Sequence, residues 1–303
     1  MTVLHTPCAY AGGRVTNKPK LPRLSPSRIN TYLSCPMKYY FQYEVSAPTI
    51  PSEAMLRGTF VHSVLERLMA RKPQDRTNEA ARDDFTEAQQ EMSRNEQFVM
   101  LALSDAEREE FWETSRECLR AYYRIEHPRD ANVVALEKWV TAPLGEFEIA
   151  GFIDRLERDS QGLVVVDYKA AKPKKAQWST DYLRQLTLYA LMCEVQMNET
   201  PHQVRIYYLG GGKDEHTRDN RVVAQSVTSA TIDSVREDAR RVFSGLNTAR
   251  ATDDFATNVT KLCDWCDYKQ WCPAHGGDKS QAKAATTAAV ELRRRQVGLP
   301  ESA

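Results

Sequence analysis

Hydrophobic residues follow two patterns along this chain, one with helical spacing and one with strand-like runs. These patterns divide the chain into helical and extended segments. Apolar residues at helical spacing predict helices over residues 25–43, 53–72, 76–127, 179–197 and 228–248. The third of these segments is predicted to form two helices that divide near Ser104. Continuous or alternating apolar runs predict strands over residues 133–141, 145–157, 163–169, 203–209 and 221–228. Helices and strands are thus interleaved, which is typical of an α/β fold with helices flanking a mixed central sheet.

We expect one domain over residues 25–275, with a helical insertion at about 53–128 before a sheet core at about 133–228. The first 24 residues, which contain several Pro and Gly residues, are predicted to be a flexible tail. Residues 276–303 are predicted to be a basic tail, at most a loose helix.

Composition narrows the class of protein only slightly. The chain has 41 basic and 41 acidic residues, so any surface for nucleic acid must be a local patch. It contains no run of about eighteen apolar residues, and its first 24 residues lack the apolar centre of a signal peptide. We therefore expect a cytoplasmic protein without a membrane span.

The residues with chemical potential lie in the hairpin formed by the second and third predicted strands. If this hairpin folds symmetrically about its Ser160–Gln161 turn, Asp154 lies directly opposite Asp167, with Cβ atoms roughly 5 Å apart. Lys169 is two residues further along and points to the same face. Two carboxylates this close need a cation between them or a raised pKa, and their oxygen atoms suit Mg²⁺ or Mn²⁺. With an ammonium group beside it, such a site is suited to hydrolysing phosphodiesters.

A simpler interpretation of the hairpin is a surface ion pair, because an Asp and a Lys two residues apart at a strand end are common. The apolar run over residues 163–166 precedes these two residues and predicts a strand buried on both faces. Charged groups at the end of a buried strand are costly unless they are paired or bind a metal. The sequence therefore favours a metal site.

Three of the seven cysteines form the pattern C-x2-C-x5-C, at Cys263, Cys266 and Cys272. Thiolates at this spacing reach one metal centre, which needs a fourth ligand. Cys35 is the first candidate, although it lies far upstream in the sequence. With Cys35 as a ligand, the metal centre would act as a staple that joins the N- and C-terminal parts of the chain.

Alternatives to this cysteine site remain open. Cys8 and His275 are the next candidates for the fourth ligand, whereas Cys118 and Cys193 lie in helical patterns typical of ordinary buried thiols. A zinc ion and a [4Fe–4S] cluster are both chemically allowed by four thiolates. A disulfide between two of the three C-terminal cysteines is a further possibility, but it is unusual in the cytoplasm.

Six short motifs follow one another along roughly residues 25–275. They are Ser27-x4-Tyr32-x2-Cys35-Pro36, Arg57-Gly58-x3-His62, Gly151-x2-Asp154, Asp167-Tyr168-Lys169, Gln185-x3-Tyr189 and the cysteine triplet. In this order they resemble the RecB-like branch of the PD-(D/E)xK nuclease superfamily. The chain is most similar to its iron–sulfur members, such as the CRISPR-adaptation exonucleases and the nuclease domain of AddB.

The resemblance implies a restriction-endonuclease-like fold and assigns a role to each matching residue. The ligands of a divalent metal would be His62, Asp154, Asp167 and the backbone carbonyl of Tyr168. Lys169 would be the catalytic lysine. Residues that contact DNA or support the site would be Arg57, Lys172, Lys174, Lys175, Gln185 and Tyr189. The ligands of a [4Fe–4S] cluster would be Cys35, Cys263, Cys266 and Cys272.

Each role has a simpler alternative. His62 precedes Glu66 by one helical turn, so the two residues could form a surface pair. Gln185 and Tyr189 share a helix face and could serve packing alone. The lysines after Lys169 could be merely solvated, although beside a phosphodiester site they are suited to contacts with the DNA backbone. One departure from the family pattern is Asp167, where many members have Glu.

Taken together, these features predict a metal-dependent DNA nuclease, an exonuclease that prefers single-stranded ends, with a structural [4Fe–4S] cluster. The expected context is DNA repair, recombination or CRISPR-type DNA processing, with a helicase or a CRISPR-type protein as partner. The chain has no P-loop, because the glycines before Lys213 lack the required spacing and the following Ser or Thr. The rival hypotheses are a non-catalytic subunit that binds nucleic acid and an adaptor protein stapled by zinc.

Overall fold

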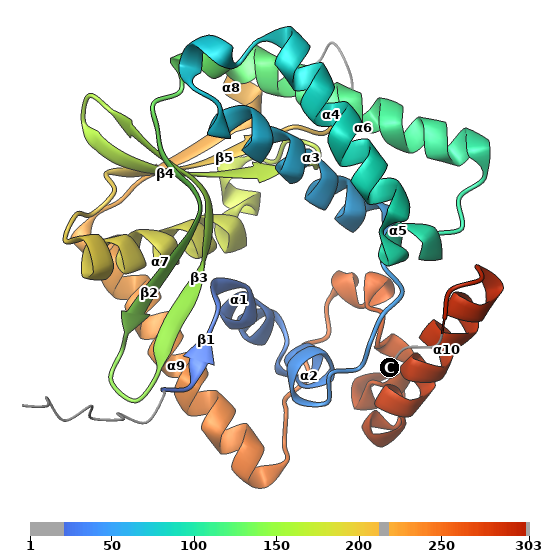
Figure 1. Ribbon diagram of the computed structural model, residues 1–303. Helices are drawn as coiled ribbons and strands as arrows, with labels where there is room; N and C mark the ends of the chain where they lie inside the picture. The colour runs from blue at the N-terminus through green and yellow to red at the C-terminus, as the bar shows by residue number, and fades with distance from the viewer. Residues whose placement is uncertain (1–20, 212–217, 301–303) are drawn as a thin grey trace, which may run out of the picture.

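The computed structural model describes residues 21–211 and 218–300 (Figure 1). The helices are α1 (Pro26–Ser34), α2 (Pro36–Tyr39), α3 (Glu53–Ala70), α4 (Asn78–Arg94), α5 (Glu96–Met100), α6 (Asp105–Ile125), α7 (Thr180–Met197), α8 (Arg218–Arg221), α9 (Ser229–Thr252) and α10 (Ala282–Gln296). The strands are β1 (Arg23–Leu24), β2 (Val133–Pro143), β3 (Glu148–Asp159), β4 (Gly162–Lys169), β5 (Gln203–Tyr208) and β6 (Val222–Ser226). The interleaved α/β pattern expected from the sequence is confirmed.

The six strands form one mixed sheet in which β3 has neighbours along both edges. One edge pairs with antiparallel β2. The other edge pairs with parallel β1 at Glu148 and Ile149, and with antiparallel β4 from Arg155 to Asp159. Strand β5 runs parallel to β4, and β6 runs antiparallel to β5. Strands β3 and β4 therefore separate just beyond Arg155, at the position of Asp154.

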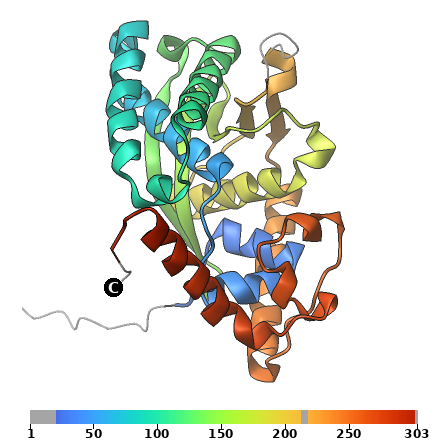
Figure 2. The same cartoon turned by 90° about the vertical axis from the view of Figure 1, so that its right-hand side faces the viewer.

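Helices cover both faces of the sheet, as Figures 1 and 2 show. On one face, α3, α4 and α6 enclose an apolar core that includes Phe60, Val164 and Val166. On the other face, α7 packs against the sheet and α9 packs against α7, around Ile153 and Val165. Alternate residues of β4 thus enter different cores, which explains its continuous apolar sequence.

Several boundaries differ from the sequence-based expectations. The single helix predicted over residues 25–43 is wrong, because Cys35 has extended backbone (φ −162°, ψ 110°) between α1 and α2. The following proline disfavours helical geometry at this residue. The segment 76–127 forms three helices instead of two, since Asn95 ends α4 and caps α5.

The ends of the chain contain more structure than predicted. Of the expected flexible tail, residues 1–20 lie outside the described part of the chain, while Arg23 and Leu24 pair with β3. The expected basic tail contains α10, and Arg293 of this helix donates to the carbonyl of Met100, at 2.6 Å, and to that of Leu101, at 2.7 Å. In the described ranges, no helix is both long and apolar enough to cross a membrane.

The segment that carries the cysteine triplet packs against the N-terminal helices. The backbone N–H of Met37 donates to Ala256 O at 3.0 Å, and the Asn258 side chain donates to Ser34 O at 2.8 Å. The buried hydroxyl of Tyr268 donates to Ala47 O at 2.9 Å. Figure 1 shows these segments side by side below the sheet. Polar contacts between main chain and side chains therefore hold Cys35 near the triplet.

Candidate active site

The point where β3 and β4 separate brings together His62, Asp154, Asp167 and Lys169. The ladder pairs run from Arg155 with Val166 to Asp159 with Gly162, which is the register expected of a Ser160–Gln161 turn. Asp154 and Asp167 are the next residues of that register. The backbone N–H of Tyr168 lies 3.4 Å from Asp154 Oδ2 and donates to it.

His62 comes to this site from α3. Its Nε2 atom lies 2.7 Å from the carbonyl oxygen of Tyr168, and its Nδ1 atom lies 3.3 Å from Asp154 Oδ2. The ring therefore contacts Asp154 rather than forming the helix-surface pair with Glu66. A proton on Nε2 suits donation to the carbonyl and leaves Nδ1 facing the carboxylate.

Lys169 and Asp167 form an ion pair on a single face of β4. The ammonium Nζ lies 2.7 Å from Asp167 Oδ2 and 3.0 Å from Oδ1. Only the contact with Oδ1 has hydrogen-bond geometry, so the buried Oδ2 atom lacks a hydrogen bond. An anionic oxygen in that state is suited to binding a further cation.

The electrostatics of the site favour the uptake of positive charge. Burial, together with the nearby charge of Asp167, raises the pKa of Asp154 to about 7, and His62 and Lys169 only partly oppose this. Burial alone would lower the pKa of Lys169, but the attraction of Asp167 outweighs it and raises that pKa overall. The two carboxylates are thus held together at a cost that a bound cation would relieve.

The donor set fits a hard divalent cation. It offers two carboxylates, one imidazole and the carbonyl oxygen of Tyr168, and oxygen-rich sets of this kind suit Mg²⁺ or Mn²⁺. Across residues 21–211 and 218–300, no three His, Cys, Asp or Glu side chains are arranged as they would be around a single bound ion.

Sequence analysis missed Glu137, which stands opposite Asp154 in the register of β2 with β3. Its φ of 41° is unusual for a residue other than glycine and marks an irregularity in β2. Burial and the charge of Glu66 raise its pKa, whereas His62 lowers it. The sequence carries no signal for this position, because Glu137 comes beside Asp154 through the pairing of β2 with β3 at an irregular residue of β2.

Helix α7 borders the site with Tyr182, Gln185 and Tyr189. Tyr189 is buried and hydrogen-bonded to Gln185, and burial raises its pKa to about 12. A Cβ atom at Gly151 would lie 2.9 Å from the Tyr189 ring, so only glycine leaves room for that ring beside β3. The Tyr182 ring lies 4.8 Å from Lys169 Nζ.

The remaining DNA-contact candidates lie at different places. Lys172, Lys174 and Lys175 are exposed in the loop between β4 and α7, and Lys174 Nζ lies 5.5 Å from the Tyr182 ring. Arg57 lies on α3 before His62 and forms a 2.7 Å ion pair with Glu53. The structure therefore places the lysines, but not Arg57, on the surface that leads from Lys169.

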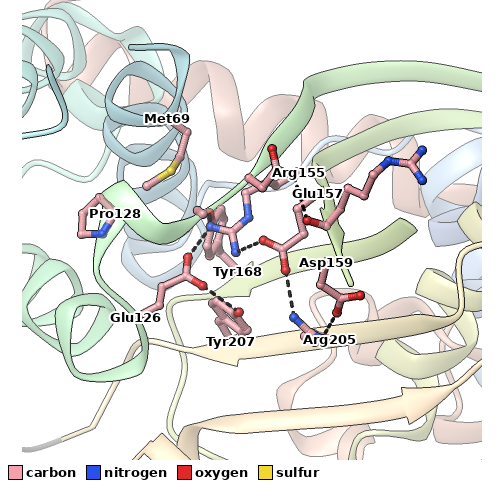
Figure 3. Close-up of polar contacts among 12 residues, drawn as sticks. Met69, Glu126, Pro128, Arg155, Glu157, Asp159, Tyr168, Arg205 and Tyr207 are labelled. Atoms are coloured by element: carbon pink, nitrogen blue, oxygen red, sulfur yellow. Dashed lines mark hydrogen bonds and ion pairs between the residues drawn. The ribbon is translucent and has the colours of Figure 1, made fainter. Parts of the chain in front are cut away.

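A buried polar network supports the hairpin of β3 and β4 (Figure 3). Arg155, fully buried, donates to the Tyr168 hydroxyl at 2.9 Å and to Glu126 Oε1 at 2.5 Å, and it pairs with Glu157 at 2.8 Å. Tyr207 also donates to Glu126, at 2.9 Å. Burial raises the pKa of Glu126, but Arg155 outweighs it and holds this pKa below its usual range. Arg155 and Tyr168 adjoin Asp154 and Asp167 in sequence, so the network fixes the strands that carry the carboxylates.

The four candidate cluster ligands line one small, partly open cavity of about 30 Å³. Cys35, Cys263, Cys266 and Cys272 all line it, together with apolar residues such as Met37 and Phe41. Every cysteine in the described residues is a free thiol, so no disulfide links the triplet there. His275 also lines the cavity, whereas Cys8 lies outside the described residues. Four cysteines that line one cavity are a suitable donor set for a thiolate-bound metal centre, although within the described residues no three of them are arranged around a single ion.

Comparison with known proteins identifies the family. The sequence model of the PD-(D/E)XK nuclease superfamily matches residues 23–273. The chain belongs to this superfamily. No curated protein sequence matches the PD-(D/E)XK chain significantly.

Two solved structures are similar to this PD-(D/E)XK nuclease. The crystal structure of a "Putative exonuclease" from Eubacterium rectale has a TM-score of 0.52 and 14% sequence identity, and the match covers 81% of this chain and 87% of that chain. A structure of SSO0001 has a TM-score of 0.36 and 12% sequence identity, and the match covers 86% of this chain and 90% of that chain. This TM-score is too low to support a conclusion about fold. The α/β architecture is therefore the restriction-endonuclease-like fold. Members of the superfamily act on DNA and typically use Mg²⁺ or Mn²⁺.

Proposed function

We propose that this chain is a divalent-metal-dependent DNA exonuclease that prefers single-stranded ends. The observation that carries the proposal is the convergence of Asp154, Asp167 and Lys169 with His62 where β3 and β4 separate. The preference for single-stranded ends is supported by the motifs shared with RecB-like nucleases. We further propose that it acts in DNA repair, recombination or CRISPR-type processing, together with a helicase or CRISPR-type partner.

Each residue of the site would have its own role in phosphodiester hydrolysis. Asp154, Asp167, His62 and the Tyr168 carbonyl would hold a divalent cation, which supplies electrostatic stabilisation to the reacting phosphate. Lys169 lies within hydrogen-bond distance of Asp167 and would orient the attacking water and stabilise charge on the phosphate oxygens. Gln185 and Tyr189 would fix the α7 side of the site. The exposed lysines after β4 would bind the DNA backbone.

We also propose that Cys35, Cys263, Cys266 and Cys272 hold a [4Fe–4S] cluster with a structural role. Support comes from the shared cavity and from the cation Lys38 in its lining, which suits an anionic group of thiolates, whereas Lys269 is paired with Asp264. Hydrolysis transfers no electrons, so the cluster would stabilise the fold by joining the segments around residues 35 and 270. Residues 25–275 would then form one domain closed by this link.

The proposed function is tested with end-labelled single- and double-stranded DNA. Protein purified without oxygen should shorten single strands progressively from one end when Mn²⁺ or Mg²⁺ is present, and should not do so with a chelator. Asp167→Asn should abolish this activity, whereas Asp83→Asn, an exposed change on α4, should leave it intact. If the wild-type protein binds DNA but does not cut it with either metal, the chain is a non-catalytic binding subunit.

A further inference from the structure

Trp178 is an exposed tryptophan in the loop that follows Lys169, and the proposed hydrolysis does not use it. Trp178 closes a short 3₁₀ turn (Ala176–Trp178) in the loop between β4 and α7, and 70% of its surface is exposed. Lys174, Lys175 and Gln177 are exposed in the same loop, and its other apolar residues are small, Ala170, Ala171, Pro173 and Ala176. Exposing a large aromatic ring to water is unfavourable in free energy, and such rings are common at binding sites.

The turn that presents Trp178 is firmly anchored. Its backbone N–H donates to Lys175 O at 2.9 Å, and the next residue, Ser179, donates to Ala176 O at 3.0 Å. Ser179 is buried, and its hydroxyl lies 2.9 Å from the hydroxyl of Tyr208 on β5. The sheet therefore fixes the base of the turn, so little backbone entropy is lost when the indole binds a partner.

Positive charge surrounds the ring and continues to the catalytic lysine. Trp178, Lys174 and Lys175 line a hollow of about 620 Å³. Among the residues that the structure describes, no carboxylate forms an ion pair with either lysine or with Lys172. Lys174 and Lys169 lie on the same Tyr182 ring, 5.5 Å and 4.8 Å from its centre. A phosphate backbone that enters at Lys169 would thus continue along cations that have no carboxylate partner within the described ranges.

We propose that Trp178 is a stacking platform for an unpaired nucleobase of the strand being cut, while Lys174 and Lys175 bind its neighbouring phosphates. This deepens the proposed function and rests on it. An aromatic face beside a basic surface is the arrangement that binds single strands without reading their sequence. Bases in a duplex are already stacked, so the platform selects unpaired ends. The excess of cations argues for a polyanion and against a neutral protein surface.

The test measures DNA binding separately from cleavage, by fluorescence anisotropy of a labelled oligothymidylate in the presence of a chelator. Removing a stacked aromatic ring weakens single-strand binding by about 5- to 150-fold, which we expect of Trp178→Ala. Trp178→Phe should retain most of the affinity. The matched control is Trp265→Ala. That indole is 77% exposed but lies in the cysteine segment, so the variant should bind the oligonucleotide as tightly as the wild type does. Binding of a blunt duplex should be insensitive to Trp178→Ala.

An oligonucleotide with abasic nucleotides near its end identifies the contact. It keeps the phosphates but removes the bases, so it should weaken binding to the wild type and have little further effect on Trp178→Ala. Equal affinity of Trp178→Ala and wild type for the single strand would overturn the platform, as would fully additive effects of the variant and the abasic sites. Because no arm requires catalysis, failure of the nuclease proposal would show separately, as intact DNA in the Mn²⁺ assay.

Discussion

Removing the side chain of Lys169 should impair DNA cleavage without impairing DNA binding. Its ammonium group lies 2.7 Å from Asp167, and a positioned charge at a phosphoryl centre is worth about 10²–10³ in rate. We expect Lys169→Ala to lower the rate of DNA cleavage by at least this factor while folding and DNA binding persist. Steady-state cleavage and anisotropy of the purified variant measure the two effects. Lys72→Ala, at an exposed lysine after α3, is the control, and a wild-type rate in Lys169→Ala would contradict the role.

Asp154 makes the metal-free protein sensitive to pH. Its folded pKa of about 7 exceeds the value of about 3.9 expected in the unfolded chain, so the folded state binds more protons between these pH values. The contribution of Asp154 to the free energy of unfolding therefore falls as pH rises from about 4 to about 7. A fifth of the side chain is exposed, so we expect a loss of about 2 kcal/mol, less than the full shift implies.

Urea unfolding with a chelator, at pH 4.5 and pH 7.5, tests this expectation. Asp154→Asn cannot ionise, so the variant should gain stability relative to wild type at the higher pH and little at the lower. Asp83→Asn on the exposed face of α4 should differ equally from wild type at both. A pH dependence that Asp154→Asn leaves unchanged would place the titrating group elsewhere.

Single residues differ in how far the sequence could predict them. The positions of Asp154 and Asp167 follow from hairpin register, which a short turn fixes locally, and the observed register is the predicted one. Glu137 could not be found in this way, because its backbone departs from regular strand geometry. Its position depends on an irregular residue of β2 paired beside Asp154, which no local pattern encodes.

At the scale of elements, the buried polar network around Arg155 stabilises the hairpin of β3 and β4 (Figure 3). The guanidinium is fully buried, and its charge is balanced by Glu126, just after α6, and by Glu157 on β3. Breaking a buried pair by removing one partner costs about 3–5 kcal/mol. We expect Glu126→Gln to lower the free energy of unfolding by about this amount, measured with urea.

The matched control for this prediction lies on α6 itself. Glu113 pairs with Arg116 and Arg120 at the surface, and exposed pairs of this kind contribute about 0–1 kcal/mol. Glu113→Gln should therefore cost less than about 1 kcal/mol. Equal effects of the two substitutions would mean that the buried network does not stabilise the hairpin.

Element types were more predictable than element ends. Helical periodicity identified α3, α7 and α9, because each buries a continuous apolar stripe. The break at Cys35 was missed, although the following Pro36 was a local signal for it. The N-terminal pairing of β1 could not be predicted, since two residues carry no periodicity and gain their partners only from the folded sheet.

Across the whole molecule, the proposed cluster would connect residues that the sequence separates widely. Three of its ligands lie within one short segment, and Cys35 reaches the same cavity from the break between α1 and α2. The contacts of Met37, Asn258 and Tyr268 already bring these segments together. A cluster bound across this junction would add its binding free energy to the stability of the fold.

We expect Cys35→Ala to lose iron and sulfide, to unfold at a lower temperature and to lose nuclease activity as a consequence. Iron and sulfide analysis, visible absorption and thermal unfolding of protein prepared without oxygen measure this. Cys118→Ala, at a buried thiol in α6, should keep its full iron content because its side chain packs in the other core. Full iron in Cys35→Ala would move the fourth ligand to His275 or Cys8, and a single zinc without sulfide in the wild type would refute the cluster. A coincident loss of iron and thermal stability in Cys35→Ala alone would show that one metal centre links the two ends of the domain.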